Sequence, residues 1–136
     1  MSNPPPPPVD LPSTVVPAIG EVAIRQLVQR FYQRVQQDPV ISVMYPPNDW
    51  AGAEERLADF LVFRFGGSEA YLAKRGSPRL RIRHAPFAIT KTARDRWVEL
   101  MLASLQEADL PEPTRGIMTE FLGQTATFLM NSTDET

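Results

Sequence analysis

Apolar side chains recur at steps of three and four residues in the stretch that begins at Glu21. This spacing places them on one face of an α-helix. The residues concerned are Ile24, Leu27, Val28, Phe31 and Val35. Because Pro39 disfavours helical geometry in the residue before it, the pattern predicts a helix that stops near Asp38.

A second helix is predicted after the loop Pro46-Pro47-Asn48-Asp49, with a short helical turn up to Met44 before that loop. This helix would begin at Asp49 or Trp50 and end at Gly66-Gly67, since glycine is typical of a helix C-terminus. Its inward positions would be Ala53, Leu57, Phe60, Leu61 and the stem of Arg64.

Two longer helices are predicted in the last third of the chain, over residues 91–107 and 113–129. Their inward residues would be Trp97, Val98, Met101, Leu102 and Leu105 in the first, and Ile117, Met118, Phe121, Leu122, Thr125 and Leu129 in the second. Any helix between Pro78 and Pro86 has at most about two turns, because proline cannot continue a helix. No strand-like alternation with hairpin signals occurs, so the predicted fold class is all-α.

Residues 1–17 differ in composition from the rest of the chain. They hold half of the 14 prolines, five of them consecutive from Pro4 to Pro8. Such a segment has too few large apolar groups to fold alone, so we expect a flexible tail that is extended or disordered and not helical. A recognition role for the proline run is the alternative to a plain tail.

Composition removes several classes of protein. The chain has no cysteine, which excludes disulfides, thiolate nucleophiles and cysteine-based zinc or iron–sulfur sites. Its net charge of −2 gives no reason to expect nucleic acid or an anionic membrane as a partner. No run of eighteen apolar residues and no signal-peptide pattern is present, so we expect a soluble, cytoplasmic protein.

Basic residues gather between Glu69 and Asp95, where no acidic residue occurs. They are Lys74, Arg75, Arg79, Arg81, Arg83, Lys91 and Arg94. A solvated basic face is the default interpretation of such a run, and nucleic-acid binding is less favoured because few aromatic residues lie among the charges. An anionic ligand bound nearby is the third interpretation.

His84 is the only histidine of the chain. Zinc sites that need two histidines are therefore impossible, and a Ser-His-Asp triad could form only around this residue. A lone histidine is more often structural or solvated than a ligand. His84, however, lies in a short segment between two prolines, beside arginines able to pair with carboxylates.

Several blocks of the sequence resemble the truncated haemoglobins of group II, the 2/2 globins, in the right order and at compatible spacing. They are Phe31-Tyr32, Tyr45-Pro46, AGAEERL at residues 51–57, Gly66-Gly67, RLRIRHAPFAI at residues 79–89, and Trp97. The similarity runs from about Ile19 to Asn131. It implies a two-over-two helical sandwich that encloses haem b, with a globin domain over residues 18–132 and a short C-terminal tail, 133–136.

By this resemblance, His84 is the axial iron ligand and coordinates through its Nε2 atom, while Nδ1 donates to a carbonyl or a water. The charges of Arg81 and Arg83 would help to keep the imidazole neutral. Tyr32, Tyr45 and Trp97 match the family's polar distal cluster. Hydroxyl and indole donors in a dry pocket would stabilise the partial negative charge of iron-bound oxygen by about 1–2 kcal/mol each, and so slow its release.

Further residues are assigned to the haem by the same resemblance. Ala53 stands where longer globins usually carry a distal histidine, so histidine ligation should not close the distal side. Apolar contacts would come from Leu57, Phe60, Leu61, Phe87 and Trp97. The carboxylates of the haem would bind Arg56 and Arg83, with Arg79 and Tyr71 as further candidates.

Three functions are compatible with these residues. The first is a haem protein that binds O2 and other diatomic ligands, such as NO and CO, with slow release, which suits storage, sensing or NO detoxification better than oxygen transport. The second is an enzyme, a haem peroxidase or NO dioxygenase, with a separate reductase, because no flavin or nicotinamide fingerprint is present. The third is a cofactor-free helical interaction module. Whether the chain is an enzyme, and its oligomeric state, a dimer included, stay open at this point.

Overall fold

The computed structural model describes residues 4–5 and 9–134, and within these ranges every regular element is a helix. The all-α prediction is therefore confirmed. In chain order the elements are η1 (Leu11–Thr14), α1 (Val15–Ile19), α2 (Glu21–Gln37), η2 (Ser42–Met44), α3 (Trp50–Arg64), α4 (Ala70–Arg75), α5 (Leu80–His84), α6 (Lys91–Ala108) and α7 (Thr114–Phe128).

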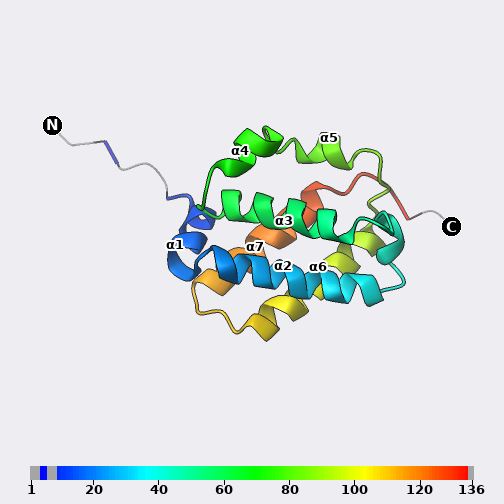
Figure 1. The fold of residues 1–136 in the computed structure, drawn as a ribbon, viewed down its shortest axis with the longest axis horizontal. Helices are drawn as coiled ribbons and strands as arrows, with labels where there is room; N and C mark the ends of the chain where they lie inside the picture. Colours follow the sequence, from blue (N-terminus) through cyan, green and yellow to red (C-terminus); the bar gives the residue numbers. More distant parts are fainter. Residues whose placement is uncertain (1–3, 6–8, 135–136) are drawn as a thin grey trace.

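Two pairs of long helices form the body of the molecule. Helices α2 and α3 lie side by side in front of α6 and α7 (Figure 1), and α2 contacts both α3 and α6. This is the two-over-two sandwich expected from the family resemblance. The short helices α4 and α5 run along the outer side of α3. No helix among the described residues is long and apolar enough to cross a membrane.

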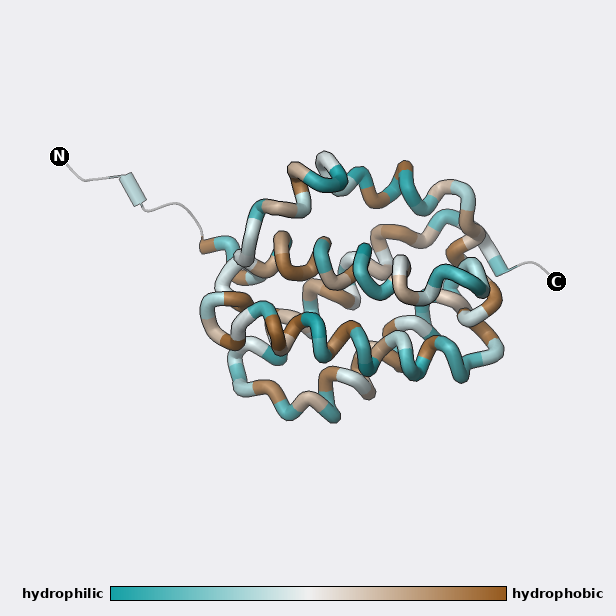
Figure 2. The backbone as a smooth tube through the Cα atoms, in the orientation of Figure 1, coloured by the Kyte–Doolittle hydropathy of each residue, from teal (hydrophilic) through white to brown (hydrophobic). Residues whose placement is uncertain are grey.

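The core forms along the apolar face of α2. All five residues predicted to point inward from this helix are buried with no exposed surface. The backbone of α2 alternates between hydrophobic and hydrophilic bands in Figure 2, as an amphipathic helix should. At about 1.5–3 kcal/mol for each large apolar side chain removed from water, this face is a main source of the fold's stability.

Helix α2 ends where the sequence predicts, before Pro39. Asp38 adopts an extended conformation (φ −95°, ψ 119°), as expected for a residue that precedes proline. Its buried carboxylate accepts hydrogen bonds from the backbone N–H groups of Val40 and Ile41 at 3.1 and 2.9 Å, and from Arg96 of α6 at 2.5 Å. Burial alone would raise the pKa of Asp38, but these hydrogen bonds outweigh it and lower that pKa.

The prediction that residues 1–17 form no helix is wrong for Leu11–Thr14 and for the start of α1. Pro12 and Pro17 both lie in first helical turns, where the missing backbone N–H would have no partner within the helix. Val15 is fully buried, and the Val16 N–H donates to the Phe65 carbonyl at 2.8 Å. The prediction of a flexible tail for residues 1–3 and 6–8 lies outside the described residues.

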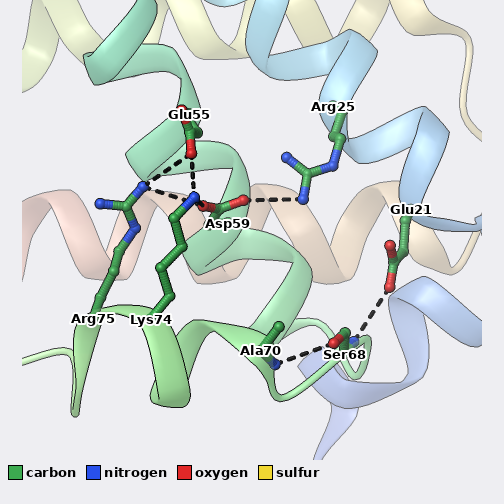
Figure 3. Close-up of polar contacts among 8 residues, drawn as sticks. All are labelled: Glu21, Arg25, Glu55, Asp59, Ser68, Ala70, Lys74 and Arg75. Carbon is green, nitrogen blue, oxygen red and sulfur yellow. Dashed lines mark hydrogen bonds and ion pairs between the residues drawn. The ribbon is translucent and has the colours of Figure 1, made fainter.

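Helix α4 was not predicted, because ion pairs with other helices hold this six-residue helix in place. Lys74 and Arg75 both bind the carboxylate of Asp59 on α3, at 3.4 and 3.2 Å, and Lys74 also pairs with Glu55 (Figure 3). Asp59 in turn pairs with Arg25 of α2 at 3.0 Å. Four of the seven basic residues between Glu69 and Asp95 are neutralised by acids in this cluster or by Asp95.

One inward position of α6 was also predicted wrongly. Leu102 is 42% exposed, whereas Met101 and Leu105 are buried as expected. The buried side of α6 is centred on Leu100, Met101, Ser104 and Leu105, so Leu102 points away from it. Leu102 was predicted to point inward because it is apolar and follows Met101, but it lies outside the buried face of the helix.

Helix α5 has the length that its flanking prolines allow and contains no buried residue. Only Leu80 packs partly against the core. The helix therefore gains little from the apolar burial that holds α2, and its position depends on polar contacts instead.

Gly66 follows α3 and packs closely against Ser13 of the N-terminal segment, so it provides a test of the contact between these two segments. Its φ is +93°, and a Cβ atom would lie 2.0 Å from the Ser13 carbonyl oxygen. We expect Gly66→Ala to lower the free energy of unfolding by about 1–3 kcal/mol. Gly123 is the matched control, since it has open space in α7, and Gly123→Ala should raise stability by about 0.5–1 kcal/mol. Urea denaturation measures both, and equal stabilities of Gly66→Ala and wild type would contradict the described contact.

Candidate functional site

Three side chains of the predicted distal cluster meet in the structure. Tyr32 is buried on α2, Tyr45 follows η2, and Trp97 comes from α6. The rings of Tyr32 and Tyr45 lie 5.6 Å apart at 87°, and Phe31 joins the cluster through the Trp97 ring at 5.0 Å. Trp50 at the start of α3 also lies 5.3 Å from Tyr45. Four separate segments of the chain thus converge on one aromatic cluster, which is packed against the core.

The members of this trio change the pKa values of its two phenols. Burial raises the pKa of Tyr32 well above its usual value of 10, and a hydrogen bond to Tyr45 raises it further. Burial also raises the pKa of Tyr45, whereas hydrogen bonds with Tyr32 and Trp97 act to lower it. The indole N–H of Trp97 can only donate, so Trp97 acts as a donor to the Tyr45 oxygen, whereas either phenol can donate to the other.

This arrangement determines how many protons the cluster can offer. Both phenols stay protonated at neutral pH because both pKa values are raised. A hydrogen bond between the two phenols uses only one of their two hydroxyl protons. The other hydroxyl proton is therefore left for a ligand outside the trio.

His84 lies at the end of α5 and is half-buried. Its Nδ1 atom is 2.7 Å from the carbonyl oxygen of Leu80, one helical turn earlier. A carbonyl can only accept a hydrogen bond, so Nδ1 carries the proton and the lone pair of a neutral ring lies on Nε2. Nε2 is thus the nitrogen that a metal could bind.

The arginines next to His84 have no carboxylate partner within 4 Å in the described part of the chain. Arg79 donates to the Ser77 hydroxyl at 3.3 Å, and Arg83 donates to the carbonyls of Arg75 and Ser77 at 2.6 and 3.2 Å. Arg81 donates to the Phe128 carbonyl at 3.2 Å. All three side chains are exposed, so the segment around His84 carries net positive charge.

The other residues predicted to contact the haem have different environments. Arg56 is exposed and pairs with Asp49 at 3.1 Å. Phe60 and Leu61 are buried and Leu57 is half-buried, whereas Phe87 is 41% exposed. Tyr71 is buried on α4, where its ring stacks on Phe63 at 5.5 Å. Four residues were predicted to bind the haem carboxylates: Arg56, Tyr71, Arg79 and Arg83. They have no common partner in the described part of the structure.

A cavity of 660 Å³ lies beside α5, a volume within the range of ligand pockets in proteins. It is lined by Leu11, Pro12, Phe60, Arg64, Pro78, Leu80, Ile117, Glu120, Phe121, Gln124, Thr125 and Phe128. Among the residues predicted to contact a haem, only Phe60 is in this lining. His84 follows Leu80 by one turn, and the Tyr32–Tyr45–Trp97 trio does not reach the cavity.

Sequence reasoning missed two residues of this region. Trp50 is part of the aromatic cluster, and its position beside the Tyr45 loop was the available signal. Asn131 follows α7 and binds the backbone next to His84, at 3.3 Å from its carbonyl oxygen. A single asparagine 47 residues away gives no local signal of such a contact.

Comparison with known proteins defines the family of this fold. Residues 14–131 match the model of the family described as bacterial-like globin. The curated group 2 truncated hemoglobin YjbI of Bacillus subtilis is 33% identical over 117 residues, which cover 86% of this chain and 88% of that protein.

Solved structures agree with the family model. The hemoglobin of Chloroflexus aurantiacus is 43% identical with a TM-score of 0.79, over 84% of this chain and 93% of that one. The truncated oxygen-avid haemoglobin of Bacillus subtilis is 31% identical with a TM-score of 0.81, over 90% of this chain and all of that one. The all-helical sandwich with its single histidine is a globin. The chain belongs to the bacterial-like globins and, among them, to the group II truncated haemoglobins.

Proposed function

We propose that this chain is a haem b protein that binds O2 and other diatomic ligands with slow release, with His84 as the axial ligand of the iron. The observation that carries the proposal is the tautomer of His84, whose Nδ1 donates to Leu80 and leaves Nε2 for a metal. Membership of the truncated haemoglobins supports the haem itself. The oxygen-avid relative from Bacillus subtilis supports slow release.

The residues present fit a haem. Its iron would be held by Nε2 of His84. This role suits a neutral imidazole whose other nitrogen, Nδ1, donates a hydrogen bond to a carbonyl oxygen, as it does here to Leu80. Leu57, Phe60, Leu61 and Phe87 would supply apolar contacts. Arg79 and Arg83 would bind the carboxylates, because neither is engaged by an acid among the described residues. Arg56 and Tyr71 are further candidates for that contact.

When bound, the haem supplies a ferrous iron on which a diatomic ligand gains partial negative charge. The role of the chain is then to place a proton donor where that charge develops. We assign this role to Tyr45, whose pKa is affected by both other members of the trio. Tyr32 and Trp97 would orient the Tyr45 oxygen through their hydrogen bonds with it, and the burial of Tyr32 would keep water from competing.

The first prediction concerns haem binding. We expect the purified chain to show a strong Soret band and His84→Ala to lose it, with recovery when imidazole is added, because free imidazole can take the place of the missing ring. An absorption titration with hemin measures this. A colourless wild-type chain would support the cofactor-free interaction module and contradict the proposal.

The second prediction concerns the release of oxygen. We expect Tyr45→Phe to speed O2 dissociation roughly tenfold or more, since one donor stabilises the ligand by about 1–2 kcal/mol. Tyr32→Phe and Trp97→Phe should speed it by smaller factors, because they act on Tyr45. Stopped-flow spectroscopy of the oxygenated proteins measures these rates.

Trp50→Phe is the matched control for these variants. It keeps an aromatic ring against Tyr45 and removes none of the hydrogen bonds of the trio. Its O2 dissociation rate should stay near that of the wild type. Rapid dissociation from the wild type, or no effect of Tyr45→Phe, would show that this cluster does not retain oxygen.

A further inference from the structure

We propose that Asn131 is a positioning residue for His84, which fixes the segment 84–89 through its side-chain amide and so helps the chain to retain its haem. The inference rests on the proposed function, since it concerns the residue assigned to the iron. It adds a residue from the C-terminal segment to the site, on the evidence of its contacts alone.

The side chain of Asn131 is saturated with hydrogen bonds. Its Nδ2 atom donates to the carbonyl oxygens of Phe87 and His84 at 2.9 and 3.3 Å. Its Oδ1 atom accepts from the Ile89 N–H at 2.9 Å and from the Ser132 hydroxyl at 2.8 Å. An asparagine amide has two protons and two lone pairs to offer, and all four are used here.

These contacts join the C-terminal segment to both ends of the turn that follows His84. The Phe87 N–H donates to the His84 carbonyl at 3.0 Å, which closes the turn around Pro86. The His84 carbonyl thus accepts two hydrogen bonds, one from this turn and one from Asn131. The backbone N–H of Asn131 also donates to the Ile89 carbonyl at 3.0 Å, so the contact does not depend on the side chain alone.

The weak burial of α5 makes these bonds important. No residue of α5 is buried, so few apolar contacts resist its displacement. One other link ties α5 to the end of α7. Arg81 donates to the Phe128 carbonyl, and its guanidinium carbon lies 4.0 Å from the centre of the Phe128 ring. Asn131 follows Phe128 by three residues. Two neighbouring contacts therefore hold α5 against the end of α7 and the segment that follows it.

Groups that orient a metal ligand commonly change metal affinity about 10- to 100-fold when they are altered. Asn131→Asp is the sharpest test, because it keeps the shape and the acceptor for Ile89 but removes both donors to His84 and Phe87. We expect Asn131→Asp and Asn131→Ala to speed haem loss about tenfold, measured by transfer of haem from the loaded full chain to excess apomyoglobin. Ser132→Ala is the control, since its side chain bonds only to Asn131 among these residues, and it should change the rate less than twofold.

Two further measurements separate positioning from general stability. The urea midpoint of the haem-free variants should match that of the haem-free wild type. In the loaded ferrous form, the iron–histidine stretching band should shift in Asn131→Asp, because the ring is less constrained. The proposal would be overturned if the haem-free variants lost enough stability to account for the faster haem loss. An unchanged haem-loss rate in Asn131→Asp would also overturn it.

Failure of the proposed function would look different. A wild-type chain that binds no haem, or that binds it equally well in His84→Ala, would refute the axial role of His84. If the wild type retains haem through His84 and the Asn131 variants retain it equally well, only the positioning role of Asn131 is wrong.

Discussion

The buried face of α2 is the contact on which the rest of the molecule depends. This face packs against α3 on one side and α6 on the other, so one amphipathic helix joins both layers of the sandwich. Phe31 is fully buried on it and contacts the rings of both Tyr32 and Trp97. The packing that stabilises the core therefore also fixes the hydrogen-bond donors, since no rotation of α2 could move Tyr32 without exposing Phe31.

The segment that carries His84 is held by a different kind of interaction. Helix α5 buries no residue, and besides the partial packing of Leu80 its contacts are mainly hydrogen bonds to carbonyls and one guanidinium–ring contact. The arginine donors are exposed, so water competes for these bonds, and they do not replace the apolar burial that holds α2. In the proposed haem complex, His84 would thus be held more weakly than the donor cluster.

Much of the fold could be predicted from the sequence, because most of its helices are long and carry a clear apolar face. The prediction failed where distant residues decide the structure. Helix α4 depends on ion pairs with Glu55 and Asp59, which no local pattern reveals. Helix formation from Leu11 onward depends on the burial of Val15 and on Phe65, which outweigh the proline content of that segment.

The candidate site was predicted unevenly for the same reason. The family resemblance named His84, Tyr32, Tyr45 and Trp97, and the structure brings the last three together. The contacts that each of them makes could not be predicted, since these depend on the relative position of three separate segments. The contacts of Asn131 were likewise absent from any local pattern. Arg79, Arg83, Arg56 and Tyr71 stay predictions as carboxylate-binding residues.

The bond between His84 and the iron is the central claim, and the single histidine allows an unambiguous test of it. Resonance Raman spectra of the ferrous, ligand-free protein can be compared between a chain with ordinary histidine and one grown with 15N-labelled histidine. The account predicts an iron–histidine stretching band that moves to lower frequency with the label. A spectrum without that band, or a band that the label does not move, would contradict it.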